Sequence, residues 1–427
     1  MNILITGGTL IDPGHLNDLL DIHIADGKIS AIRPPAADNV LENFDQIIDA
    51  SNKIVTPGLI DMHVHLREPG YEYKETIASG CQAAACGGFT SICPMPNTNP
   101  VNDSSDVTKY ITDKNIAAHS ARIYPVAAIS IGLNGQALCD YSALKEAGAV
   151  AVTDDGFPVK NSLLMRRAME NAKKAGLPLI SHCEDLDLTG DGVMNEGNTA
   201  RKMGLTGIPN AAESIMVMRD IALCALTEAP LHIAHVSTAE SVRAIREAKK
   251  SGLPITAETA PHYFTLTDAD VETYRADAKM NPPLRSANDR EAVREGLADG
   301  TIDVIATDHA PHSKDEKNTD FTNAPNGIIG LETSVPLSLK LVETGVLSME
   351  ALIYKMASAP AHILGLKSGL NAGNPADITI LDPAADDTVD ASRFRSLSSN
   401  TPFDGWQVRG QAVLTMVEGV CVYNQMT

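Results

Sequence analysis

Eight short apolar runs that alternate with helix-like segments constrain the fold of this chain more than any other feature of its sequence. The runs are LIDMHVHL (59–66), FTSICPM (89–95), ARIYPVAAI (121–129), AVAVTDD (149–155), LPLISHC (177–183), LHIAHVS (231–237), LPITAET (253–259) and IDVIATD (302–308). Segments rich in Ala, Glu, Lys and Arg separate many of them, for example residues 74–87, 163–176, 211–229 and 238–252. This alternation predicts an α/β fold, a (β/α)8 TIM-like barrel. A doubly wound open sheet is the rival architecture, but no glycine-rich phosphate-binding turn follows the first run.

Both ends of the chain have a different texture. They contain short alternating runs cut by turn signals, such as NILIT before Gly-Gly near the start and NPADITILDP near the end. This pattern is typical of antiparallel strands and not of βα units. We therefore expect one small β-sandwich domain built from residues 1–56 and 366–427, beside a barrel domain of residues 57–365.

The acidic composition limits the partners of the chain. Its 427 residues include 34 Lys and Arg against 54 Asp and Glu, a formal net charge of -20. Such a surface does not attract nucleic acids or anionic membranes, so we expect neither as a partner. No apolar run approaches the roughly 18 residues that span a bilayer, and the start lacks the basic region of a signal peptide. The 7 cysteines form no CxxC pair, which favours free thiols and a cytoplasmic location.

Residues that can bind a metal ion recur where the apolar runs end. In a barrel these ends meet at one face, the face that carries active sites. His63 and His65 are two residues apart on a strand, so both side chains point to one face and can share an ion. The other candidates are Asp154 and Asp155 in the fourth run, His182 in the fifth, His235 in the sixth and Asp308 in the eighth. Imidazole and carboxylate ligands suit Zn²⁺, with Co²⁺ and Mn²⁺ as alternatives.

A further histidine, His232, precedes His235 by three residues. Strand alternation then predicts that the two side chains point to opposite faces, with a packing role for His232.

Seven segments together resemble the dihydroorotase family of cyclic amidohydrolases. They are DMHVHLREPG (61–70), PMPNT (94–98), VTDDG (152–156), SHCED (181–185), HVST (235–238), KMNPPLR (279–285) and TDHAPH (307–312). The resemblance extends over essentially the whole chain, and HLREPG followed by MPNT is specific among amidohydrolases. It implies one or two zinc ions per chain. The ligands that it implies are His63, His65, Asp155 and Asp308 for one ion, and Asp155, His182 and His235 for a second.

The bridging ligand is the position where this sequence departs from many relatives, which use a carboxylated lysine. The fourth run ends in Asp154-Asp155, and Lys160 lies several residues further on. The chain therefore resembles the bacterial type with an aspartate bridge, for which we expect Asp155. Asp154 is the alternative if the strand register differs by one residue.

The resemblance also implies a substrate site. Dihydroorotate carries a carboxylate, and family positions that match Arg67, Asn97 and His312 hold it, while the position of Asn281 contacts the ring. An ordinary salt bridge to Glu68 or Glu75 is the alternative role for Arg67, and a rigid Asn-Pro-Pro turn is the alternative for Asn281. Residues 310–330 form a long polar stretch after the eighth run, which we expect to be either a loop that closes over the substrate or a mobile surface loop.

The function implied is the reversible, zinc-dependent interconversion of L-dihydroorotate and N-carbamoyl-L-aspartate in pyrimidine biosynthesis. Asp308 would take a proton from the attacking water and return it to the departing ring nitrogen. Two alternatives remain: a hydantoinase or allantoinase type of cyclic amidohydrolase, and a non-catalytic dihydroorotase-like partner of aspartate transcarbamoylase. Members of the family often form homodimers or join aspartate transcarbamoylase.

Overall fold

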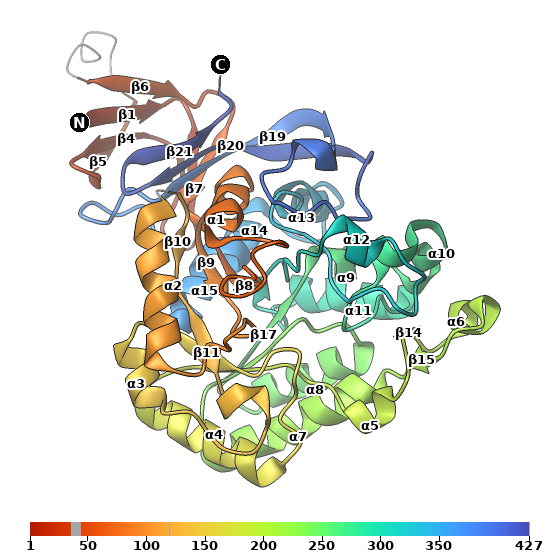
Figure 1. The fold of residues 1–427 in the computed structure, drawn as a ribbon. Helices are drawn as coiled ribbons and strands as arrows, with labels where there is room; N and C mark the ends of the chain where they lie inside the picture. The colour runs from red at the N-terminus through yellow and green to blue at the C-terminus, as the bar shows by residue number, and fades with distance from the viewer. Residues whose placement is uncertain (36–43, 119, 427) are drawn as a thin grey trace.

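The computed structural model describes residues 1–35, 44–118 and 120–426. A barrel of parallel strands, surrounded by helices, lies beside a smaller pair of β-sheets that carries both chain termini (Figure 1). The barrel strands are β8 (Leu59–Val64), β9 (Phe89–Pro94), β10 (Arg122–Ile123) with β11 (Val126–Ala128), β12 (Ala151–Thr153), β13 (Leu179–Ser181), β16 (Leu231–Ile233), β17 (Ile255–Thr259) and β18 (Val304–Ile305). Each of the eight predicted runs contains a barrel strand, which confirms the predicted fold class.

The barrel closes between its first and last strands. The third barrel strand is split into β10 and β11 by Tyr124 and Pro125. On one side of this break β8, β9 and β10 are paired in order, and on the other side the pairing continues from β11 to β18. Proline has no N–H to donate to a strand ladder, which accounts for the break. A parallel bridge joins Val64 to His309, and His65 N donates to His309 O at 2.8 Å. The ends of β8 and β18 are therefore fixed side by side.

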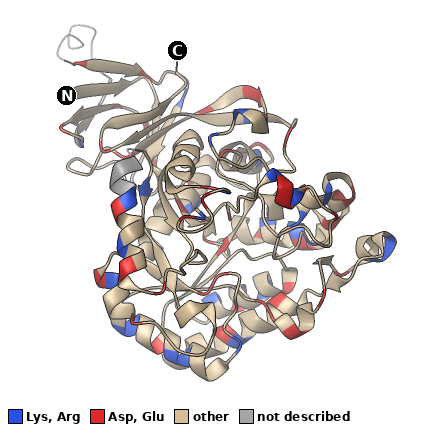
Figure 2. Cartoon of the chain, viewed as in Figure 1, with Lys and Arg blue, Asp and Glu red and all other residues tan. Residues whose placement is uncertain are grey.

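The outer layer consists mainly of helices that follow the strands. The helices are α1 (Ile77–Cys86), α2 (Ser105–Ala118), α3 (Tyr141–Glu146), α4 (Ser162–Ala175), α5 (Leu186–Thr189), α6 (Asn198–Met203), α7 (Ala211–Thr227), α8 (Ala239–Lys250), α9 (Pro261–Thr265), α10 (Val271–Tyr274), α11 (Ala287–Ala298), α12 (Lys314–Lys317), α13 (Ser334–Glu343), α14 (Met349–Ile353) and α15 (Ala359–Leu364). Basic and acidic residues are interspersed along the outer helices (Figure 2). Among the described residues, no helix is both long enough and apolar enough to cross a membrane.

The sequence explains where two of the long helices begin and end. The Asn161 side chain accepts hydrogen bonds from Leu163 N and Leu164 N at the start of α4, which ends at Gly176 with φ 66°. In α8 the Thr238 side chain accepts a hydrogen bond from Ser241 N, and two lysines lie in the last turn. N-terminal caps satisfy free N–H groups, and C-terminal cations favour the negative end of the helix dipole.

Strands from both chain ends form the smaller unit. One sheet has the order β5 (Lys28–Arg33), β4 (Asp21–Ala25), β1 (Asn2–Thr6) and β6 (Gln46–Asp49). The other has the order β21 (Val420–Asn424), β20 (Gln407–Val417), β19 (Ile378–Thr388), β7 (Ile54–Pro57), β2 (Thr9–Asp12) and β3 (Leu16–Leu19). A separate core of side chains such as Ile5, Ile24, Val55, Ile380 and Leu414 packs these strands together.

The strand directions correct one detail of the prediction. Most pairs in the smaller unit are antiparallel as expected, but β1 pairs with β6 and β2 pairs with β7 in parallel. Alternation of polar and apolar residues reports which face of a strand is buried and not the direction of its neighbour.

Between the barrel strands β13 and β16, the short strands β14 (Met194–Asn195) and β15 (Gly207–Ile208) form a separate two-stranded sheet. This sheet projects from the barrel together with α6 (Figure 1).

Candidate metal centre and substrate pocket

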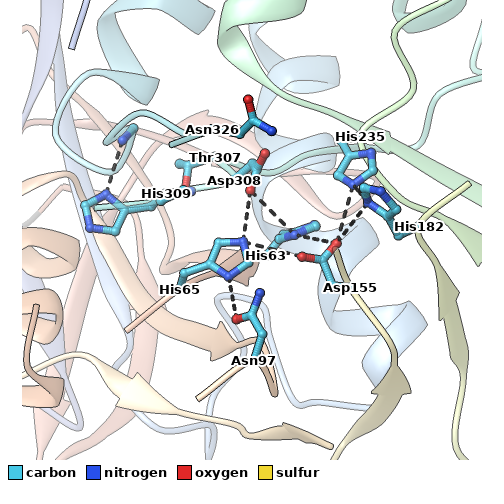
Figure 3. Close-up of polar contacts among 12 residues, drawn as sticks. His63, His65, Asn97, Asp155, His182, His235, Thr307, Asp308, His309 and Asn326 are labelled. Atoms are coloured by element: carbon cyan, nitrogen blue, oxygen red, sulfur yellow. Dashed lines mark hydrogen bonds and ion pairs between the residues drawn. The ribbon is translucent and has the colours of Figure 1, made fainter. Parts of the chain in front are cut away.

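Six buried side chains meet at the carboxyl ends of the barrel strands (Figure 3). His63 lies in β8 and His65 follows it, Asp155 comes two residues after β12, and His182 comes directly after β13. His235 and Asp308 follow β16 and β18. All six residues expected as metal ligands are thus brought together by strands far apart in the sequence.

Their atoms form two overlapping groups around Asp155. His63, His65 and Asp155 make the first group and Asp155, His182 and His235 the second, with the ligand atoms in each group within 4.8 Å of one another. Asp155 Oδ1 lies 3.4 Å from His63 Nε2 and 3.4 Å from His235 Nε2, and Asp155 Oδ2 lies 3.5 Å from His65 Nε2. Asp308 Oδ1 completes the first group, 3.2 Å from His65 Nε2 and 3.6 Å from His63 Nε2.

The donor atoms fit a metal ion. His63 Nε2 and Asp155 Oδ1 are buried and have no hydrogen-bond partner among the residues that the structure describes. Burial alone would raise the pKa of Asp155, but the facing His63, His182 and His235 hold it well below its usual range. Burial opposes protonation of His63, but Asp155 and Glu258 raise its pKa well above the ordinary value. Unpartnered imidazole and carboxylate atoms at this spacing are compatible with a metal site.

The neighbouring aspartate, Asp154, lies apart from this cluster. Its carboxylate accepts hydrogen bonds from Ile129 N at 2.8 Å, from Ser130 N at 3.0 Å and from the Ser130 hydroxyl. Lys160 is on the surface, with half of its side chain exposed and its Nζ 3.3 Å from Asp187 Oδ1. Of the residues considered for the bridging position, only Asp155 therefore faces the histidines.

A second layer of polar groups orients the histidines. His63 Nδ1 contacts Glu258 Oε1 at 2.6 Å, and His65 Nδ1 contacts Asn97 Oδ1 at 2.9 Å. His182 Nε2 contacts Glu184 Oε2 at 3.0 Å, which leaves its Nδ1 toward Asp155. Such contacts fix the ring orientation and the tautomer of a ligating histidine.

The structure corrects the orientation predicted for His232 but not its role, because the buried side chain belongs to neither group of possible metal ligands. Its ring lies in the barrel interior, with Nε2 3.2 Å from Glu258 Oε2 and Nδ1 2.8 Å from Thr256 Oγ1, so Glu258 links it to His63. Strand alternation did not apply because β16 ends at Ile233 and His235 has φ 31°. His235 thus turns back to the side that His232 already faces.

Three residues of this centre have a left-handed backbone conformation. Arg67, His235 and Asp308 adopt φ values of 61°, 31° and 50°. Left-handed conformations of residues other than glycine cost on the order of 1–3 kcal/mol each and are enriched at functional sites. The surrounding contacts must therefore hold these three side chains in place.

A cavity of about 210 Å³ opens beside the cluster. Every residue expected to bind metal or substrate lines it except His63. The lining comprises His65, Arg67, Asn97, Asp155, Gly156, His182, His235, Asn281, Asp308, Ala310, His312, Asn326 and Gly327. Asn281 Nδ2 donates to Glu184 Oε2 at 2.9 Å, and Asn97 Oδ1 contacts His65 Nδ1, so among the described residues the other end of each amide is left for a ligand.

Arg67 and His312 form the basic wall of this cavity. Arg67 Nε donates to Pro311 O at 3.2 Å, and Arg67 Nη2 lies 3.4 Å from His312 Nε2. Burial, together with the positive charges of Arg67, Lys74 and Lys317, lowers the pKa of His312 to about 3. Burial likewise lowers the pKa of Arg67, to about 10, so at neutral pH the arginine is charged and the histidine is neutral.

Sequence reasoning missed several residues of the site. Asn326 and Gly327 line the cavity, and Glu184 and Glu258 hold the histidines. Glu184 could have been predicted, because it lies two residues after His182 in the segment SHCED. Glu258 is the next-to-last residue of the seventh apolar run, where a buried charge needs a partner. Asn326 lies near the end of the long loop 310–330, and no local pattern marked it.

Comparisons with known proteins agree on one family of enzymes. A family model described as dihydro-orotase-like matches residues 52–241. The dihydroorotase of Desulforapulum autotrophicum is 56% identical over 425 residues, and that of Geobacter metallireducens is 54% identical over 431 residues. In both cases the match covers 100% of this chain and 100% of the relative.

Solved structures with the same fold are also found. The L-hydantoinase (dihydropyrimidinase) from Arthrobacter aurescens superposes with a TM-score of 0.87 at 28% identity, covering 100% of this chain and 96% of the other. A D-hydantoinase from a Bacillus sp. has a TM-score of 0.84 at 24% identity, over 99% of this chain and 95% of the other. The fold is therefore shared with hydantoinases, whereas the sequence is much closer to dihydroorotases.

Proposed function

The chain belongs to the dihydroorotase family, and from this premise we propose which of its residues carry out the family's reaction. That reaction is the reversible hydrolysis of L-dihydroorotate, a cyclic amide, to N-carbamoyl-L-aspartate. The substrate presents two groups to an enzyme, a ring amide that must be attacked and a carboxylate that must be held. The cavity offers a group of metal-binding side chains for the first and a basic wall for the second.

We assign the metal as Zn²⁺, with His63, His65, Asp155 and Asp308 around one ion and Asp155, His182 and His235 around a second. The buried, unpartnered atoms of His63 and Asp155 support this assignment. When bound, zinc lowers the pKa of a coordinated water from about 15.7 to about 7 and polarises a carbonyl.

Asp308 transfers the proton. Burial raises the pKa of its carboxyl, but His65, His63 and His235 outweigh this and lower it, so Asp308 is ionised at neutral pH. An ionised carboxylate can accept the proton of the attacking water and then deliver it to the departing ring nitrogen. The same group serves the reverse reaction with the two roles exchanged.

Arg67 and His312 hold the substrate carboxylate, with Asn97 beside them and Asn281 toward the ring. The single observation that carries the proposal is the position of the Arg67 guanidinium in the same cavity as Asp155 and Asp308. A bidentate contact between arginine and carboxylate is worth about 1.5–3 kcal/mol, which favours an acidic ring over a neutral one. A hydantoinase has no need for this charge.

The test is to compare L-dihydroorotate and hydantoin as substrates of the purified protein, with the bound metal measured by plasma mass spectrometry. We expect turnover of dihydroorotate, little turnover of hydantoin, and one or two zinc ions per chain. Turnover of hydantoin in preference to dihydroorotate would overturn the carboxylate assignment. Metal-free protein without activity, unresponsive to added zinc, would instead favour a non-catalytic partner of aspartate transcarbamoylase.

We further propose that the protein acts in the cytoplasm as a homodimer or in a complex with aspartate transcarbamoylase. Retention of all six ligand residues favours an active subunit in either assembly. Light scattering of the purified chain, alone and mixed with aspartate transcarbamoylase from the same cell, distinguishes the two assemblies. A molar mass of a single chain in both samples would contradict this proposal.

A further inference from the structure

A segment from the C-terminal part of the chain reaches the rim of the substrate cavity. Residues 389–406 connect β19 to β20 and contact the barrel at several points. The Ser396 hydroxyl donates to Glu75, and the Ser398 hydroxyl donates to Lys74 O at 2.8 Å. Asn400, only 5% exposed, extends this contact to the loop that follows β18.

Asn400 joins the two ends of that loop, residues 310–330. Its Nδ2 donates to Ala310 O and to Gly327 O, each at 3.1 Å. Its Oδ1 accepts from His312 N at 3.1 Å, and its backbone carbonyl accepts from Ile329 N at 3.0 Å. An asparagine amide offers two donors and one acceptor oxygen, and here all of them contact the loop.

The same stretch of backbone carries the basic wall. Ala310, His312 and Gly327 line the cavity, and Arg67 Nε donates to Pro311 O between the first two. The His312 ring contacts Asn326 O at 2.8 Å, on the other side of the loop. The positions of both Arg67 and His312 thus depend on the part of the loop that Asn400 holds.

The middle of the loop is held by other contacts, which do not involve Asn400. Lys317 Nζ donates to Ala276 O at 2.9 Å and to Pro325 O at 2.9 Å, and Lys279 Nζ donates to Thr322 O at 2.8 Å. Loss of the Asn400 side chain therefore changes the geometry of the loop ends while these contacts keep the rest of the loop folded.

We infer that Asn400 is a positioning residue for substrate recognition, which sets the geometry of Arg67 and His312 without touching the substrate. The inference rests on the proposed role of these two residues in holding the substrate carboxylate. It makes the connection between β19 and β20 part of the substrate site.

The test is a double-mutant cycle with Asn400→Ala and Arg67→Met, measured on L-dihydroorotate. For Asn400→Ala alone we expect KM to rise about tenfold, because a charge-assisted contact is weakened, with kcat within about threefold of the wild type. In the Arg67→Met background, Asn400→Ala should have a clearly smaller effect on kcat/KM than in the wild type, because His312 is then the one remaining group of the two that it positions. Ser398→Ala, a change in the same segment that leaves the loop contacts intact, should resemble the wild type.

Each other outcome has a distinct meaning. Additive losses in the double variant, or a fall in kcat with unchanged KM, would overturn the role of Asn400. Normal kinetics of Arg67→Met alone would overturn the carboxylate assignment instead. Should Asn400→Ala not fold, Asn400→Asp takes its place, because it keeps the size and the acceptor for His312 N and removes both donors.

Discussion

At the scale of single residues, position and not residue type decides what a carboxylate does. Asp154 and Asp155 are adjacent and chemically identical, yet Asp154 is saturated by Ile129 and Ser130 whereas Asp155 faces three histidines. Burial raises the pKa of Asp154 to about 6, while the histidines hold that of Asp155 well below its usual range. A carboxylate ligand has to stay ionised, and of these two aspartates Asp155 is the one that the histidines keep ionised and face directly.

Replacement of Asp308 by alanine is expected to abolish the reaction in both directions without unfolding the chain. A positioned acid or base contributes about 10²–10⁴-fold to the rate, and Asp308 serves both directions. The measurement is kcat with L-dihydroorotate and with N-carbamoyl-L-aspartate, with circular dichroism and metal content recorded in parallel. Near-native turnover with either substrate would contradict the proton-transfer role.

Glu258→Gln is expected to weaken metal binding. The Glu258 carboxylate contacts His63 Nδ1 at 2.6 Å, and loss of its charge makes His63 a poorer ligand. Outer partners of ligating histidines are worth about 10–100-fold in metal affinity. A titration of the metal-free protein with Zn²⁺ in a chelator buffer measures this affinity, and Glu247→Gln, an exposed change, is the control. Equal affinities in the two variants would show that Glu258 does not tune the site.

At the scale of elements, the loop 310–330 is a packed wall of the cavity. It contains the short helix α12 and buried side chains such as Ala324, Ile328 and Lys317. These buried side chains pack the loop against the barrel, while the mobility that was one of the two expectations stays a prediction. Whether the loop closes further over substrate stays a prediction.

Lys317 gives this loop a pH dependence. Burial lowers its pKa to about 7, although the neighbouring Asp277 opposes the shift and Lys279 adds to it. The unfolded chain keeps this proton up to about pH 10.4, whereas the folded protein releases it near 7. Between these two values the unfolded state binds more protons, so Lys317 makes the free energy of unfolding rise with pH.

Lys317→Met removes that rise. We expect the stability difference, wild type minus variant, to be larger at about pH 9 than at about pH 6.5 by at least about 1 kcal/mol, since one pKa unit corresponds to about 1.4 kcal/mol. Urea unfolding at the two pH values measures it, with the exposed Lys340→Met as the control. A difference that is constant or that shrinks with pH would refute the assignment.

At the scale of the whole molecule, we expect metal binding and folding to be coupled through the barrel. The six ligand residues come from five barrel strands or the loops after them, so the site exists only when the barrel is closed. A ligand that binds the folded state alone stabilises it by about 2.7 kcal/mol at a concentration of 100 times Kd.

Removal of metal with a chelator is therefore expected to lower the unfolding temperature, and added Zn²⁺ to restore it. Scanning calorimetry of the metal-free and reloaded protein measures this shift. Asp155→Ala, which removes the residue shared by both groups, should show a much smaller response to zinc. An equal response in this variant would place the stabilising metal elsewhere.

The sequence by itself determined the eight-stranded barrel, the sheets built from both chain ends and the types of residue at the metal centre. Each of these depends on local information: apolar runs of strand length, turn residues between them, and ligand residues where the runs stop. The resemblance to dihydroorotases, carried by segments such as HLREPG and TDHAPH, added the residues proposed to bind the substrate.

Only the tertiary structure decided which groups support that centre. Glu258 contacts His63 across 195 residues of sequence, and Asn400 contacts His312 across 88. His235 reaches the cluster through a left-handed backbone that no strand pattern specifies. Contacts between distant segments depend on how the strands of the closed barrel and its loops are arranged in space. A local pattern of residues reports only which face of a strand or helix is buried, so it cannot predict these contacts.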